Sequence, residues 1–133
     1  GGRSALARFS VQLMQPVLYR IGELWVEGTI SVTAEHVASN LLRAEVAQLV
    51  RISPSPLRPE RIVVGCAPGE QHDICALMVA LFLRRRGFDV IYAGASVEPQ
   101  DFVTDVQRIS PSAVCLSAGA PATRSRCGSR STT

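Results

Sequence analysis

A histidine stands two residues after a carboxylate in a short polar segment of this chain, at Glu70 and His72. The segment lies between a strand-like apolar run and a helix-like run. Open α/β sheets bind their ligands in the crevice beyond the carboxyl ends of the strands, where such a turn would lie. An imidazole oriented by a neighbouring carboxylate is a good ligand for a transition metal. The spacing therefore predicts that His72 binds a metal, although a solvated loop histidine is the alternative on this evidence alone.

The elements that would position this turn are short strands alternating with helices. The apolar runs at residues 61–67, 89–94 and 113–117 have the length and composition of buried parallel strands. Helical patterns at residues 74–86 and 99–110 lie between them. Strands that alternate with helices through short loops predict βαβ units and a parallel sheet.

The first half of the chain is predicted to be helical. Apolar residues recur every three or four positions over residues 6–24, and Pro16 should kink or break this helix. A second helix is expected after Ser31, because its side chain suits an N-cap. Glu35 would lie on the apolar face of that helix, where its carboxylate needs a polar partner.

These patterns divide the chain into four segments. Residues 1–52 are expected to form part of a helical bundle, and residues 53–60, with three prolines, a stiff linker. Residues 61–120 form the α/β sheet segment, which is short for a free-standing sheet of this type. Residues 121–133 contain little that could form a core and are expected to be a disordered tail.

Charge and composition exclude several classes of protein. All 14 basic residues are arginine, against 11 acidic residues, and three of the arginines lie in the last ten positions. The body is therefore neutral, without the clustered basic face of a nucleic-acid-binding domain. No apolar run approaches the roughly 18–20 residues of a membrane helix, and the start of the chain lacks a secretory signal. The four cysteines lack zinc-site spacing, so we expect a cytoplasmic protein without a membrane partner.

The His72 turn resembles the signature of cobalamin-binding modules of methionine synthase type, in which a helical bundle precedes a flavodoxin-like domain. That signature is Asp-x-His-x-x-Gly, a gap of 41 residues, and then Ser-x-Leu. Here Glu70, His72 and Cys75 fill the first part, and Ser117 follows after a gap of 41 residues. Glu replaces Asp, Cys replaces Gly, and Gly119 replaces Leu. The resemblance implies an α/β fold, with an N-terminal helical-bundle segment followed by a truncated flavodoxin-like (Rossmann-like) parallel sheet.

A second motif lies in the helical half. Trp25, nine further residues and then Glu35-His36 are similar to the upper-face motif of cobalamin-dependent light sensors attached to MerR-type DNA-binding domains. Glu at position 70 is also typical of that branch. The resemblance implies a regulatory, non-enzymatic module that responds to light and binds adenosylcobalamin, with methylcobalamin as the second choice. DNA would be bound only by a domain absent from this chain, and homo-oligomer formation stays open.

The same resemblance implies roles for individual residues. His72 would displace the cofactor's own base and bind cobalt from below, while Glu70 holds the other ring nitrogen. Trp25 would cover the upper ligand, and Glu35 would hydrogen-bond a ribose hydroxyl. Small residues on the first and third strands would leave room for the nucleotide tail. The full set of expected cofactor-binding residues is Trp25, Glu35, His36, Gly65, Glu70, His72, Asp73, Ser117 and Gly119.

Three other functions stay open at this point. A methyl-carrier corrinoid protein for a methyltransferase system would need an open upper face, which a bulky Trp25 disfavours. A cofactor-free interaction domain would make the His72 turn a coincidence. A non-functional fragment of either cobalamin protein is the third, because Cys75 and Gly119 depart from the family pattern.

Overall fold

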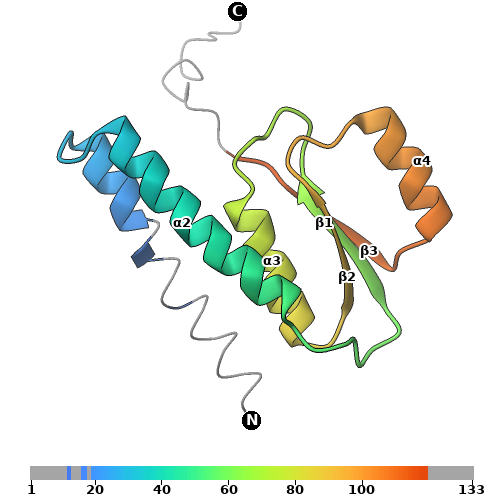
Figure 1. Cartoon of the computed structure of the whole chain (residues 1–133). Coiled ribbons are helices and arrows are strands. Elements are labelled where there is room, and N and C mark those ends of the chain that lie inside the picture. Colours follow the sequence, from blue (N-terminus) through green and yellow to red (C-terminus); the bar gives the residue numbers. More distant parts are fainter. Residues whose placement is uncertain (1–11, 13–15, 18, 120–133) are drawn as a thin grey trace, which may run out of the picture.

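Figure 1 shows the computed structural model, which describes residues 12, 16–17 and 19–119. A helical segment at residues 19–26 precedes the larger elements. Every strand and helix predicted after residue 31 is confirmed to within one or two residues. The elements are α2 (Val32–Arg51), β1 (Arg61–Cys66), α3 (Ile74–Arg85), β2 (Asp89–Gly94), α4 (Pro99–Ile109) and β3 (Ala113–Ser117).

The sheet has three parallel strands in the order β2-β1-β3. Val63 of β1 pairs with Ile91 of β2 on one side and with Val114 of β3 on the other. This is the order of the first three strands of a flavodoxin-like sheet. The predicted fold class, a helical segment followed by a flavodoxin-like parallel sheet, is therefore confirmed.

Helix α3 is buried on two sides. Ala76 and Ala80 pack against the central strand β1, and their small side chains let the helix approach the sheet closely. Leu77 and Leu81 face the other way and pack against Val46 of α2. Helix α3 therefore lies between α2 and the sheet, while α4 lies on the other side of the sheet (Figure 1).

Helix α2 begins with the predicted cap. The Ser31 hydroxyl accepts a hydrogen bond of 3.1 Å from the backbone N–H of Ala34. Before it, Gly28 has φ +76, a conformation that favours glycine, and it follows the end of the first helical segment. The predicted break at Pro16 involves neighbouring positions outside the described residues, so it stays a prediction.

The segment between α2 and β1 is held against the rest of the fold. Residues 53–60 contain neither helix nor strand. The backbone N–H groups of Leu57 and Arg58 both donate to the carbonyl of Gly87, each at 2.9 Å. The Arg58 guanidinium lies 4.1 Å from the centre of the Phe88 ring, in a cation–π contact. The proline-rich stretch is thus tied to the turn between α3 and β2.

The tail expected at residues 121–133 lies outside the described residues. Within the described part of the chain, no helix is long and apolar enough to cross a membrane.

Replacing a buried leucine of α3 should be far more costly than replacing an exposed leucine of α2. Leu81 is 1% exposed and Leu41 is 65% exposed. We expect Leu81→Ala to lower the free energy of unfolding by about 2–5 kcal/mol, because it leaves a cavity between α2 and α3. Leu41→Ala should change it by no more than about 0.5 kcal/mol. Urea unfolding followed by circular dichroism measures both, and equal effects would contradict the two-sided packing of α3.

Candidate functional site

The turn that carries His72 lies at the carboxyl end of the central strand. It connects β1 to α3, and the backbone N–H of Ala67 donates to the carbonyl of Ser117 at 2.8 Å. The chain adds β2 on one side of β1 and β3 on the other, so the strand order reverses between β1 and β3. Open α/β sheets bind ligands at such a switch point. The turn therefore occupies the position that the sequence predicted for a binding site.

Glu70 ties this turn to the end of β3. One carboxylate oxygen accepts the backbone N–H of His72 at 2.7 Å, and the other accepts the backbone N–H of Gly119 at 2.6 Å. These two hydrogen bonds, the one from His72 first, lower the pKa of Glu70. A side chain at position 119 would collide with the Glu70 carboxylate. In this structure Glu70 holds backbone groups, so its expected bond to the His72 ring stays a prediction for the cofactor-bound protein.

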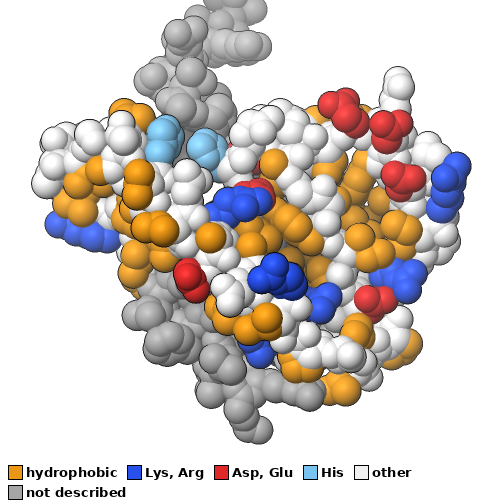
Figure 2. Space-filling view, in the orientation of Figure 1, with side chains coloured by type: hydrophobic (Ala, Val, Ile, Leu, Met, Phe, Trp, Pro, Cys, Tyr) orange, Lys and Arg blue, Asp and Glu red, His pale blue; other side chains and the backbone are white. Residues whose placement is uncertain are grey.

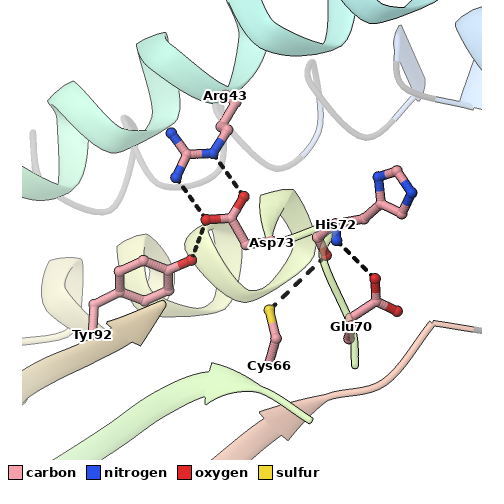
Figure 3. Close-up of polar contacts among 6 residues, drawn as sticks. All are labelled: Arg43, Cys66, Glu70, His72, Asp73 and Tyr92. Atoms are coloured by element: carbon pink, nitrogen blue, oxygen red, sulfur yellow. Dashed lines mark hydrogen bonds and ion pairs between the residues drawn. The ribbon is translucent and has the colours of Figure 1, made fainter. Parts of the chain in front are cut away.

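The His72 imidazole points away from both neighbouring carboxylates (Figure 3). Its side chain is exposed, and no described residue makes a hydrogen bond to the ring. The described part of the chain also contains no group of three or more His, Cys, Asp or Glu side chains able to hold a metal ion. A metal ion bound by His72 would therefore need further ligands from outside the described residues.

Asp73 is turned to the opposite side of the turn and is buried, with a side chain that is 6% exposed. Its two oxygens accept bonds of 2.7 Å from Nε and a terminal nitrogen of Arg43, and the Tyr92 hydroxyl donates at 2.6 Å (Figure 3). The bonds from Arg43 are the main cause of the lowered pKa of Asp73, and they raise the pKa of Arg43. Burial, followed by the bond to Asp73, raises the pKa of Tyr92. The expected contact between Asp73 and the cofactor stays a prediction, and here both its oxygens are already engaged.

The second motif places a carboxylate and an imidazole together on α2. His36 Nδ1 lies 2.7 Å from one oxygen of Glu35, and the Ser39 hydroxyl donates to the other at 2.9 Å. The carboxylate thus finds the polar partners it needs within its own helix. Trp25, in the preceding helical segment, is 48% exposed.

The two motifs are brought together by α2. His36 is seven residues, or about two helical turns, before Arg43, so the two share one face of α2. Arg43 in turn holds Asp73, the residue after His72. Both histidines of the chain are visible on one side of the molecule (Figure 2).

The small residues expected to line the nucleotide tail have different surroundings. At Gly65 the space for a side chain is already filled, since a Cβ would lie 3.2 Å from atoms of both Ala93 and Val97. Ser117 is partly buried at the end of β3, and Gly119 is exposed beside Glu70. Close packing by β2 and by the loop after it explains the glycine at position 65, and the contact of Gly65 with a cofactor stays a prediction.

Sequence reasoning missed Arg43 and Tyr92. Neither belongs to a recognisable motif, and they lie 30 and 19 residues from Asp73. The adjacency of an acid to His72 was the only signal in the sequence, and it does not indicate which way the side chain turns.

Comparison with known families identifies the family of this chain. Residues 60–127 match the family described as B12 binding domain, and a second family with the same description matches residues 3–50. The chain belongs to the B12-binding domain family. The His72 turn, exposed at the switch point of the sheet, lies within the first of these matched ranges.

Two relatives from Myxococcus xanthus are similar to this member of the B12-binding family. The chain is 34% identical over 106 residues to the HTH-type transcriptional repressor CarH. The aligned region covers 80% of the chain and 35% of CarH. The chain is also 30% identical over 89 residues to the HTH-type transcriptional repressor CarA, in an aligned region that covers 66% of the chain and 31% of CarA. The chain thus spans about a third of the length of these two relatives.

Removing the Glu70 carboxylate should loosen the turn in the cofactor-free protein. In Glu70→Ala the backbone N–H groups of His72 and Gly119 lose their acceptors, so both should exchange with deuterium faster than in the wild type. Glu98→Ala is a matched control, because Glu98 is exposed and its side chain makes no capping bond to α4. Amide exchange measured by NMR checks this, and unchanged exchange at both positions would contradict the role given to Glu70.

Proposed function

We propose that this chain is the cobalamin-binding regulatory module of a transcriptional regulator, with His72 as the lower axial ligand of cobalt. The observation that carries the proposal is the exposed His72 ring at the sheet's switch point, without a hydrogen bond from any described residue, in a chain of the B12-binding family. The two relatives named as transcriptional repressors support a regulatory role over an enzymatic one. In this proposal DNA is contacted by a separate domain.

The turn is suited to hold a ligating imidazole. Cobalamin supplies a cobalt with an axial position open to a neutral ring nitrogen. His72 would donate that nitrogen, and Glu70, two residues before it, is near enough in the chain to hold the second ring nitrogen once it leaves its backbone partners. This change of partner would couple cofactor binding to the end of β3, where Gly119 now binds Glu70.

The helical segment is suited to the other face of the cofactor. The Trp25 ring and the polar pair Glu35-His36 are all at least partly exposed, so they are accessible to a ligand. An adenosyl group offers a flat base for an aromatic contact and ribose hydroxyls for a carboxylate. We therefore favour adenosylcobalamin over methylcobalamin, and a module that responds to light through loss of this upper group.

Removal of the His72 imidazole should abolish cobalt ligation by the protein. His72→Ala should weaken cobalamin binding by about tenfold or more and shift the visible spectrum of the bound cofactor, because the lower ligand is lost. Gln71→Ala, an exposed neighbour in the same turn, is the control and should leave both unchanged. An identical spectrum in the wild type and His72→Ala would refute ligation by His72.

Light should change the assembly of the adenosylcobalamin-bound protein. In the dark, protein and adenosylcobalamin should elute together from gel filtration, and illumination should alter the elution volume. Separate elution of the cofactor in the dark would contradict the proposal. Transfer of a methyl group from bound methylcobalamin to a supplied acceptor would instead indicate a carrier protein for a methyltransferase.

A further inference from the structure

One polar cluster, centred on the buried carboxylate of Asp73, joins the two halves of the molecule. Arg43 from α2, Asp73 at the N-terminus of α3 and Tyr92 from β2 form a clamp in which Asp73 accepts three hydrogen bonds of 2.6–2.7 Å (Figure 3). Among the described residues, no other ion pair or side-chain hydrogen bond joins α2 to the segment from β1 onward. The orientation of α2 on the sheet therefore depends on this cluster for its directional contacts.

The packing of α2 against α3 is otherwise apolar in the described part of the chain. Val46 is the one buried residue of α2, and it packs against Leu77 and Leu81 of α3. Apolar contacts of this kind favour close packing but are not directional. A bidentate Arg–carboxylate pair fixes both the distance and the angle between the two side chains, because two parallel hydrogen bonds must form together. The clamp therefore sets where α2 lies along α3 and how it is rotated.

The position of the clamp connects it to both cobalamin motifs. Asp73 directly follows His72 in the chain, and its side chain turns away from the His72 ring (Figure 3). Arg43 lies about two turns after His36 on the same face of α2. A shift of α2 by one turn would move His36 by about 5.4 Å relative to the His72 turn.

We propose that Arg43, Asp73 and Tyr92 are positioning residues, which hold the Glu35-His36 motif over the His72 turn and so strengthen cobalamin binding without touching the cofactor. The inference rests on the proposed function, since it takes His72 and His36 to face the same ligand. It assigns Asp73 to the clamp, because both its oxygens are already engaged there.

The test compares two arginine substitutions of nearly equal exposure. Arg43→Met breaks the clamp. The control, Arg61→Met, breaks a second ion pair, in which Arg61 lies 2.8 Å from Asp89 at the opposite end of the strands. The arginine side chains are 47% and 48% exposed, but Asp73 is 6% and Asp89 is 31% exposed. We expect Arg43→Met to weaken binding of adenosylcobalamin in the dark by about tenfold, and Arg61→Met by less than about twofold.

A second measurement separates positioning from a general loss of stability. His72 is intact in Arg43→Met, so the bound cofactor should keep the spectrum of the wild-type complex. His36→Ala should weaken binding in the wild type and have a smaller effect in the Arg43→Met background, because α2 no longer holds that face over the turn. A merely structural role for Arg43 would leave the effect of His36→Ala the same in both backgrounds.

The outcomes distinguish this inference from the proposed function. If the wild type shows the spectrum of a ligated imidazole while Arg43→Met binds as tightly as Arg61→Met, the positioning role is refuted and the function stands. If the wild type shows no such spectrum, the function fails, and with it the inference. Should Arg43→Met not fold, Tyr92→Phe keeps the ion pair and removes one bond to Asp73. Tyr92→Phe should then bind more weakly than Arg61→Met, and equal affinities would refute the inference.

Discussion

The burial of α3 on two sides is the constraint on which the rest of the structure depends. Its alanines meet β1 and its leucines meet α2, so the helix has little freedom to move or rotate. The first residue before the helix is Asp73, and His72 comes just before that. The packing of α3 thus fixes the point at which the turn leaves the core. His72 is exposed, but it lies just before this closely packed helix.

Within the turn, charged groups are divided between two structural tasks. Glu70 accepts backbone N–H groups from the turn and from the end of β3, and Asp73 accepts bonds from α2 and β2. The carboxylates thus face different partners on either side of the His72 ring (Figure 3). Since a buried carboxylate is stable only when it is paired, Asp73 also resists leaving its partners. The ring is the group in this arrangement that remains accessible to a ligand.

The strands and most helices could be predicted from the sequence because their signals are local. Alternation of apolar runs with helical patterns located every strand, and Ser31 marked the start of α2 through its side chain. Contacts over long stretches of chain had no such signal. Arg43 lies 30 residues before Asp73 in the chain. The direction of the Asp73 side chain depends on the position of α2, which the sequence of the turn does not determine. The spacing between Glu70 and the end of β3 was recognised in the sequence. The hydrogen bond from the Gly119 backbone to Glu70 was not predicted, because every residue except proline has a backbone N–H that could donate.

The carboxylates of Glu70 and Asp73 connect the His72 turn to two other parts of the fold, the end of β3 and helix α2. If His72 binds cobalt as proposed, movement of its ring toward the metal would also displace its backbone N–H, which donates to Glu70, and Glu70 accepts a second bond from the end of β3. The same movement would also displace Asp73, the next residue, which Arg43 connects to α2. The apolar core beneath is closely packed and deforms little, so the displacement passes through these polar contacts. On the outer side of α2, Val37 and Leu41 are 54% and 65% exposed, which places an apolar surface on the helix that the clamp would move. Under the proposed function, a change in the cofactor at His72 would therefore act on the position of α2 through these contacts.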